Sequence, residues 1–353
     1  MGDAGEAQRL VAGHFESPRA AARAARSKCP HSNRRRWTPA PRTVLSTATM
    51  SGRTAGAASY LAFPVILGGT IWLGIALLPV LGAPTTLTVA TGVGLLAVMI
   101  AERVWPYRPV WNRGHGDLAT DLLHAVVSGV GATRLVRPLV GVVGVVVAGA
   151  LSRTIGLELW PTSWPYVAQL GLALVVAELP QYWVHRWQHE HDALWRLHAT
   201  HHSAPRLYFL NAARFHPLDL SLLYFVGYLP LIALGCPEDV LMLFALFDAI
   251  FGMLQHSNVD VRLGSLNRVF SMAEVHRWHH SRTVREANTN YGSNLMIWDL
   301  VFGSFFLPRD REPPVEIGIA DMPDFPTRYL DQLASPFRWR SLTRVPPAAE
   351  RAA

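Results

Sequence analysis

Histidine is concentrated in one stretch of this chain, at spacings that suit metal binding. Eleven of the 15 histidines fall between residues 185 and 280. Eight of these form three short clusters: His185 and His189; His198, His201 and His202; His276, His279 and His280. Neutral imidazole is the commonest metal ligand in proteins. Clusters of this density therefore predict a metal cage.

The spacing within each cluster places its rings on one face of a helix. His185 and His189 are four residues apart, and the two His-x-x-His-His clusters combine i, i+3 and i+4 positions. Each adjacent pair is splayed enough to serve two metals or two sides of one. Eight histidines exceed what one tetrahedral zinc uses, whereas two iron atoms with four or five ligands each account for them. Gln188 precedes His189 where a zinc-protease helix has glutamate, so that class is not supported.

Three further histidines lie near the clusters. His256, in Gln-His-Ser-Asn at the end of an apolar segment, is expected as a ninth ligand. His216 is a possible additional ligand, although Pro217 opens the next helix and His216 could equally cap it or bond to another ligand. His191 is expected to be a solvated or capping residue.

Carboxylates near the clusters are candidates to accept the other N–H group of a ligating imidazole. By position these are Glu178, Glu190, Asp219, Glu274 and Asp299. Glu178 lies seven residues before His185, on the same helix face and inside an apolar segment, where a carboxylate is costly unless it faces a cavity. A functional role and a plain interhelical hydrogen bond both remain open for Glu178.

The elements that position these residues are predicted to be membrane helices. Half of the 353 residues are hydrophobic, and they form long blocks at 60–81, 85–102, 164–184, 218–235 and 240–254, most of them near the roughly 20 residues that span hydrocarbon. In the less regular stretch 121–157 we expect one span, 139–151, preceded by an interfacial helix. The prediction is an all-α polytopic bundle of about six spans; a soluble bundle is the alternative.

Arginine in the connecting segments predicts the orientation of this bundle. With the basic N-terminal segment inside, Arg103, Arg108 and Arg113 follow the second span on the cytoplasmic side, as the positive-inside rule requires. The histidine clusters then share the same face. We therefore expect a multi-pass protein with a cytoplasmic helical cap that carries a dinuclear metal site.

The net charge of +7 resides in the N-terminal segment. Residues 1–53 contain ten Lys or Arg and three Asp or Glu, without an aromatic-interleaved basic module, so a nucleic-acid partner is not expected. No apolar core of a signal peptide precedes residue 60; the segment is expected to be disordered, transit-like, or untranslated if synthesis starts at Met50. Cys29 and Cys236 cannot form a disulfide framework.

Four regions are predicted along the chain. Residues 1–55 form the basic extension, 56–162 an N-terminal transmembrane region, 163–310 the histidine-cluster domain, and 311–353 a C-terminal cytoplasmic tail.

The histidine-cluster domain resembles the fatty acid hydroxylase/sterol desaturase superfamily of membrane di-iron enzymes. The matching segments run from His185 to Phe306 and read HRWQH, LWRLHATHHS, NAARFHPLD, QHSNVDV, EVHRWHHSR and NTNYGSNLMIWDLVFGSFF. The resemblance implies two iron ions, an O2-dependent oxidation of a lipid C–H bond as hydroxylase or desaturase, and an external electron donor. That donor would be a separate protein or a reduced pterin.

Three other functions remain open. One is an alkylglycerol-type ether-lipid monooxygenase of the same superfamily. Another is a histidine-rich membrane metal transporter, although the clusters flank the predicted spans rather than fill them. The third is a catalytically silent relative that binds lipid, although all eight cluster histidines are present.

Overall fold

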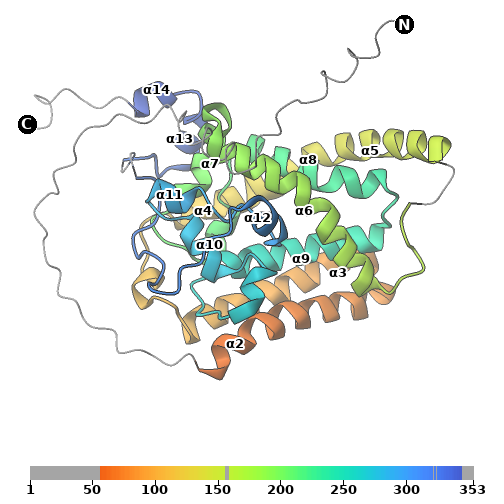
Figure 1. Ribbon diagram of the computed structural model, residues 1–353, viewed down its shortest axis with the longest axis horizontal. Coiled ribbons are helices and arrows are strands. Elements are labelled where there is room, and N and C mark those ends of the chain that lie inside the picture. The colour runs from red at the N-terminus through yellow and green to blue at the C-terminus, as the bar shows by residue number, and fades with distance from the viewer. Residues whose placement is uncertain (1–55, 156–158, 321, 323, 344–353) are drawn as a thin grey trace, which may run out of the picture. The chain divides into compact units, whose positions relative to one another are not determined.

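The structure, a computed structural model, describes residues 56–155, 159–320, 322 and 324–343. The predicted basic extension and the last ten residues lie outside this part of the chain. Within it every regular element is a helix and no β-strand is present. Figure 1 shows long helices gathered in one bundle, with shorter helices together at one end.

The helices of the first half of the described chain are α2 (Ala57–Phe63), the π-helix η1 (Pro64–Gly68), α3 (Gly69–Val104), η2 (Pro109–Asn112), α4 (Leu118–Leu123), the π-helix η3 (His124–Ala132), α5 (Thr133–Ile155) and α6 (Tyr166–Glu190). Those of the second half are α7 (Asp192–His202), η4 (Phe209–Ala213), α8 (Pro217–Ala233), α9 (Glu238–His256), η5 (Gly264–Arg268), α10 (Ala273–His279), α11 (Val284–Ala287), α12 (Ile297–Phe302), α13 (Tyr329–Ala334) and α14 (Trp339–Leu342). We call α7, α10, α11 and their connecting loops the cap.

Four helical stretches are long and apolar enough to cross a membrane: Ala57–Val104, Leu118–Thr154, Tyr166–Glu190 and Glu238–His256. The shorter α8 is also apolar. In the most apolar window of α9, 61% of the residues are buried inside the bundle, against 11% in Leu118–Thr154. Thus α9 is the central helix, whereas α5 presents its apolar side chains outward, as a lipid-facing helix does.

The first stretch is a helical hairpin that reverses at Gly82. Gly82 has φ of 69°, a left-handed conformation that glycine adopts without a Cβ clash. A Cβ placed on Gly94 would lie 3.1 Å from Oγ1 of Thr70, so the segments before and after Gly82 pack against each other. The two predicted segments, 60–81 and 85–102, are the two arms of this hairpin.

The expected break in the stretch 121–157 is wrong. Helix continues from α4 through η3 into α5, so no separate interfacial helix precedes residue 139. Pro138 lies inside α5; a proline removes one N–H donor, and a helix continues through it where adjacent turns adjust. Here the turns before Thr133 are already widened into a π-helix.

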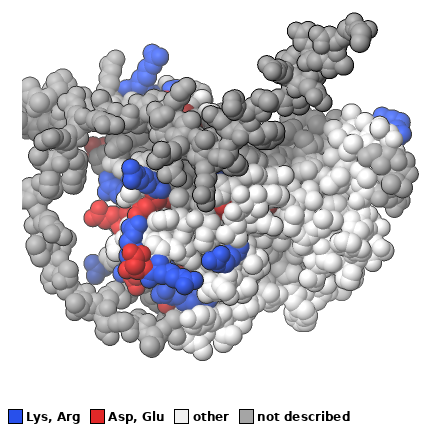
Figure 2. Space-filling view, in the orientation of Figure 1, with Lys and Arg blue, Asp and Glu red and all other residues white. Residues whose placement is uncertain are grey.

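Charged side chains gather at the cap end of the bundle. Figure 2 shows Arg, Asp and Glu over the cap, while most of the visible helical surface carries neither charge. The same end carries the segments that contain the histidine clusters. Chain segments that are distant in the sequence, from α6, α7, α9 and α10, therefore meet at one end of an apolar bundle.

Candidate metal centre

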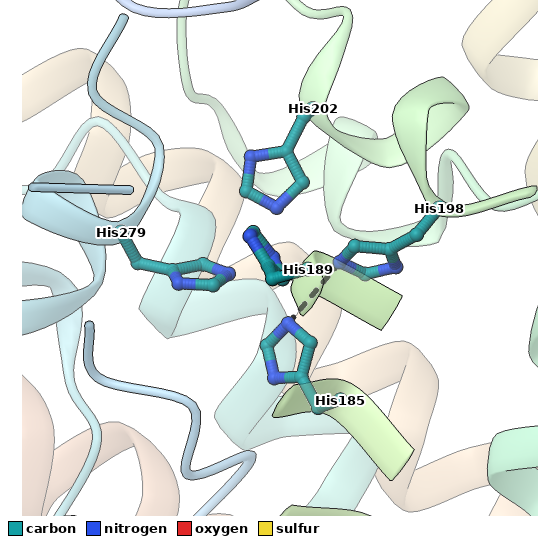
Figure 3. Close-up of side chains that lie close together, drawn as sticks. All are labelled: His185, His189, His198, His202 and His279. Atoms are coloured by element: carbon teal, nitrogen blue, oxygen red, sulfur yellow. Dashed lines mark hydrogen bonds between the residues drawn. The ribbon is translucent and has the colours of Figure 1, made fainter. Parts of the chain in front are cut away.

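The nine predicted ligands form two groups. The five-histidine group contains His185 and His189 from α6, His198 and His202 from α7, and His279 from α10. The four-histidine group contains His201 from α7, His256 from α9, His276 from α10 and His280, which caps α10. In each group the potential ligand atoms all lie within 4.8 Å of one another. Figure 3 shows the five rings of the first group pointing toward a common space.

Helix geometry explains why adjacent histidines separate into different groups. In α7 the pair His198 and His202 lies one turn apart on one face, and the intervening His201 turns to the other group. The end of α10 repeats this arrangement in reverse, because His276 and His280 share the four-histidine group and His279 joins the other. Two short helices thus contribute to both groups and hold them side by side; the rings of His202 and His280 stack at 4.3 Å.

Hydrogen bonds orient most rings of the five-histidine group. Nδ1 of His185 lies 2.7 Å from the carbonyl oxygen of Tyr291, and Nδ1 of His279 lies 2.8 Å from that of Thr289. Nδ1 of His198 lies 2.9 Å from Oδ2 of Asp219. Nδ1 of His189 lies 3.2 Å from Oδ1 of Asn288. Since these oxygens accept, we assign the proton of each ring to Nδ1, which leaves the Nε2 lone pair facing inward.

The inward-facing nitrogens fit a metal ion. Nε2 of His185 and Nε2 of His198 lie 3.1 Å apart, and with both rings protonated on Nδ1 two lone pairs face each other there. Nε2 atoms of His189, His202 and His279 are buried without a hydrogen-bond partner. A cation between these nitrogens satisfies all five, and imidazole donors suit iron, zinc, copper or nickel.

The imidazoles of the four-histidine group also converge, but fewer of their Nδ1 atoms have a hydrogen-bond partner. Nε2 of His276 lies 2.9 Å from Nε2 of His256 and 3.0 Å from that of His280. Nδ1 of His256 lies 3.2 Å from Oδ1 of Asn211, whereas the Nδ1 atoms of His201, His276 and His280 have no partner. His201 stacks on the ring of Phe215 at 4.1 Å.

The cap holds its imidazoles in the neutral state. Burial lowers the pKa of His198, His202, His276, His279 and His280 well below the usual histidine value, and the neighbouring histidines lower it further. A neutral imidazole has the free lone pair that a metal requires. No ligating carboxylate joins either group among the described residues.

Among the candidate carboxylates, Asp219 contacts a cluster histidine directly. It is fully buried at the start of α8, where it accepts from Nδ1 of His198 and from the side-chain amide of Gln188. Asp299 supports a ring indirectly. It accepts the backbone N–H groups of Tyr291 and Gly292 and thereby holds the loop in which the carbonyl oxygen of Tyr291 contacts His185.

The other predicted carboxylates do not touch the rings. Glu178 is fully buried in α6 and accepts the backbone N–H of Asn294 at 3.1 Å. Asn294 lies in the loop between α11 and α12, so this hydrogen bond joins a helix to a loop and not two helices. Glu190 pairs with Arg186 at 2.9 Å on the surface. Glu274 accepts from the Leu263 N–H and the Asn267 amide.

Four of the described histidines lie outside both groups: His115, His124, His191 and His216. His216 caps α8 by accepting the N–H of Leu218 at 3.2 Å, and its Nε2 lies 3.2 Å from the carbonyl oxygen of Leu333. His191 precedes α7 as its N-terminal cap position. His124 joins the Phe215 carbonyl to the Gln332 side chain, and so ties the C-terminal segment to the bundle.

Sequence reasoning missed the amide residues that support the rings. Asn211 and Asn288 each place a side-chain oxygen against an Nδ1 atom. Asn211 lies in η4, on a loop whose ends are fixed by a buried ion-pair network: Arg206 and Arg214 bind Asp117 at 2.8 and 2.9 Å. Asn211 lies in the segment NAARFHPLD, which carries part of the resemblance given above. Its role depends on its contact with His256, which joins segments far apart in sequence.

A family model covers the histidine-cluster region of this chain, and several known proteins are similar to the chain. The model of a family described as fatty acid hydroxylase matches residues 170–304. The ornithine lipid hydroxylase OlsE of Rhizobium tropici is 39% identical over 243 residues, which cover 68% of this chain and 72% of that protein. No solved structure matches the chain significantly.

Alkylglycerol monooxygenases are also similar over a shorter region. The Danio rerio protein is 31% identical over 156 residues, 44% of this chain and 34% of that protein. The Homo sapiens protein is 33% identical over 147 residues, 41% of this chain and 32% of that protein. The chain thus matches about a third of the length of these relatives.

Proposed function

The chain belongs to the fatty acid hydroxylase superfamily, and from this premise we propose that it is an oxidoreductase that uses O2 to hydroxylate or desaturate a C–H bond of a lipid. The observation that carries the proposal is the convergence of nine imidazoles in two groups at one end of an apolar helical bundle. The names of its relatives, ornithine lipid hydroxylase and alkylglycerol monooxygenase, agree with a lipid substrate.

Two iron ions are proposed as the cofactor, one for each histidine group. The five-histidine group and the four-histidine group would each hold one of them through neutral nitrogen donors. When bound, the irons supply the O2-dependent redox chemistry that protein side chains lack.

The protein's own residues set the conditions for that chemistry. Asp219, Asn288 and the carbonyls of Tyr291 and Thr289 fix the ring orientations before metal binds, which lowers the cost of assembling the site. Burial under the cap excludes water from the ring nitrogens. The adjacent apolar bundle would place the acyl chains of membrane lipids beside the cap.

Hydroxylation places one oxygen atom of O2 in the substrate and reduces the other to water, so it consumes two electrons and two protons from a donor. We propose a separate donor, either a protein or a reduced pterin. The cap is the face on which a soluble donor would dock, since the rest of the helical surface visible in Figure 2 carries few charged side chains.

We further propose six membrane passes with the cap on the cytoplasmic side. The two arms around Gly82, the stretch Leu118–Thr154, α6, α8 and α9 make six apolar segments. Arginines near the cap, such as Arg103, Arg108 and Arg113, support this orientation. Under this topology 56–162 is a transmembrane region, 163–310 the histidine-cluster domain and 311–353 a cytoplasmic tail.

The ether-lipid monooxygenase activity is a second candidate, supported by the similarity to alkylglycerol monooxygenases. It differs from acyl or headgroup hydroxylation in the carbon that is oxidised. A transporter is not proposed, because the histidine groups gather at the cap end instead of following a path through the bundle.

The test is oxidation of lipids by the iron-loaded protein under 18O2. Purified protein is reconstituted with lipid extracts that contain ornithine lipids, alkylglycerols and phospholipids, together with a reductase system. Mass spectrometry then detects either 18O in one lipid class, which indicates hydroxylation, or loss of two hydrogens, which indicates desaturation. Protein that carries two irons and leaves every lipid class unchanged would contradict the proposal.

A further inference from the structure

Two oppositely charged side chains lie near the middle of apolar helical stretches. Arg137 belongs to Leu118–Thr154 and Asp248 to Glu238–His256, and each is close to the midpoint of its stretch. A charge at this depth of a span is costly, and it marks a partner, a water-filled space or a ligand. Neither Arg137 nor Asp248 forms an ion pair with any described residue. The two charges are therefore free to bind a ligand.

Asp248 has one oxygen atom that nothing occupies in the described part of the chain. Its Oδ1 accepts the side-chain amide of Asn294 at 3.1 Å, whereas its Oδ2 has no hydrogen-bond partner. Asp248 is half-buried, and Oδ2 retains accessible surface. The carboxylate of Glu178 lies close by, because it accepts the backbone N–H of the same Asn294. Two neighbouring acids without a basic partner favour a cation that approaches Oδ2.

Two tyrosines of α8 connect Arg137 with Asp248. The rings of Tyr224 and Tyr228 stack at 4.1 Å, and Tyr228 packs edge-on against Phe244, one helical turn from Asp248. Tyr228 lies within electrostatic range of both Arg137 and Asp248. The hydroxyl groups of both tyrosines lack a hydrogen-bond partner among the described residues, and both retain accessible surface. We call Arg137, Tyr224, Tyr228 and Asp248 the polar row; it crosses three helices.

The surface around the polar row is open and apolar. Arg137 is exposed, and the nearby Leu135, Leu139 and Val142 of α5 are 82%, 57% and 66% exposed. On α9, a Cβ placed on Gly252, one turn from Asp248, would meet no atom within 4 Å. Open apolar surface on a membrane helix faces lipid chains. A ligand of the polar row is therefore an amphiphile, whose chains lie on this surface.

We propose that the polar row binds the zwitterionic headgroup of a membrane lipid, with a primary amine at Asp248 and an acidic group at Arg137. The ammonium group donates to Oδ2 of Asp248, and a phosphate or carboxylate accepts from the guanidinium of Arg137. The tyrosine hydroxyls between them can donate to, or accept from, the linking atoms. A lipid without an amine leaves Asp248 unpaired, and a lipid without an acidic group leaves Arg137 unpaired.

The polar row would select the substrate of the proposed oxygenase. Asp248 lies eight residues before His256 on α9, which is about 12 Å along the helix axis. A headgroup bound there lies on the membrane side of the four-histidine group. Its position would determine which carbon of the lipid reaches the histidine groups. This selection rests on the proposed oxygenase function, whereas the binding of the headgroup does not.

Isothermal titration calorimetry on the full chain in maltoside micelles tests the binding, with empty micelles as the blank. The probe is dihexanoyl phosphatidylethanolamine, which carries a primary amine and a phosphate. Dihexanoyl phosphatidylglycerol lacks the amine, and dodecylamine lacks the acidic group. We expect the native chain to bind phosphatidylethanolamine about tenfold more tightly than either of the other two probes, because each of them leaves one charge of the polar row unpaired.

Variants assign the two charges. Asp248→Asn keeps an oxygen for Asn294 and should lower the affinity for phosphatidylethanolamine to that for phosphatidylglycerol. Arg137→Gln, at an exposed position, should weaken the binding of both phospholipids about tenfold. Arg134→Gln is the matched control, since Arg134 is also exposed on α5 but does not act on either tyrosine; it should bind like the native chain. Competition with Nα-lauroyl-lysine, which carries a carboxylate in place of the phosphate, identifies the preferred acidic group.

Equal affinity of the native chain for phosphatidylethanolamine and phosphatidylglycerol overturns the proposal. Equal phosphatidylethanolamine affinity in Asp248→Asn and Arg134→Gln overturns it as well. If Asp248→Asn fails to fold, unchanged binding in Arg137→Gln overturns it instead. A protein that binds phosphatidylethanolamine but oxidises only lipids without an amine refutes the role in substrate selection. Headgroup binding in a protein that oxidises no lipid leaves the site standing and refutes the oxygenase function.

Discussion

In the five-histidine group, four Nδ1 atoms lie against acceptors on other elements, whereas in the four-histidine group three Nδ1 atoms, those of His201, His276 and His280, have none. The first group also includes the carboxylate contact of Asp219. Rings that are oriented before metal binds lose less freedom on binding. The difference therefore predicts one firmly held metal and one that exchanges more readily.

Replacement of a ligand from each group should give the largest effect. His279 and His280 are adjacent at the end of α10 but belong to different groups, so His279→Ala and His280→Ala form a matched pair. Each variant should retain one metal instead of two, and lipid oxidation should fall by at least about 100-fold, because loss of a ligand exceeds the 10–100-fold effect of losing an outer partner.

Metal content by mass spectrometry and the 18O2 assay measure both variants. His191→Ala is the control, since this residue neighbours the first cluster but lies outside both groups; it should behave like the native chain. A His280→Ala protein that retains both metals would show that the two groups do not bind separate ions.

Removal of the Asp219 charge should have the next largest effect and should be confined to the five-histidine group. Asp219→Asn keeps an oxygen that accepts from Nδ1 of His198, so the ring orientation survives while the negative charge is lost. We expect metal affinity at this group to fall by about 10–100-fold, as measured by competition with a chelator of known affinity. Glu190→Gln is the matched control, because Glu190 pairs with Arg186 and touches no ring.

The order of metal loss on chelation tests the comparison directly. Iron-loaded protein exposed to a chelator should lose its first metal from the four-histidine group, several-fold faster than the second, because His276 and His280 lack Nδ1 partners. Timed metal analysis on native protein and on His280→Ala separates the phases. The fast phase should be missing in His280→Ala; its presence there would reverse the assignment.

The histidine spacing predicted the eight cluster members of the two groups, and His256 was expected from its place at the end of an apolar segment. Whether each adjacent pair serves two metals or two sides of one metal was left open by the sequence. Helical periodicity is local, so i, i+3 and i+4 positions identify shared faces without knowledge of the fold. The family was predicted from the histidine-cluster segments, and the all-helical architecture was predicted from the long apolar blocks. Both predictions are confirmed. The ligand roles of these histidines remain predictions.

The hydrogen bonds that orient the histidine rings could not be predicted, because they join segments far apart in sequence. Asn211 reaches His256 from 45 residues away, and Asn288 reaches His189 from 99. Position suggested Asp219 and Glu190 equally, yet one binds His198 and the other a surface arginine. The continuity of helix through Pro138 likewise depended on the backbone of the preceding turns.

The smallest expected effect concerns the stability of the loop that supports the four-histidine group. This loop ends in Arg206 and Arg214, both bound to Asp117. Burial opposes ionisation of Asp117, but the hydrogen bonds and charges of the two arginines outweigh it and lower the pKa from 3.8 to about 2. The charged carboxylate therefore stabilises the folded state by about 2 kcal/mol.

This stabilisation should be complete above the unfolded pKa of 3.8 and should disappear as the pH falls through about 2. Denaturant unfolding of the metal-free native chain and of Asp117→Asn measures it, and absence of metal prevents histidine protonation from contributing through metal release. The difference in unfolding free energy between the two proteins should shrink between about pH 4 and pH 2. A constant difference would mean that hydrogen bonding, not charge, carries the contribution. At neutral pH the metal-loaded Asp117→Asn protein should lose metal faster from the four-histidine group alone. Asn211, which contacts His256 of that group, belongs to this loop, whereas the residues that contact the Nδ1 atoms of the five-histidine group lie outside it.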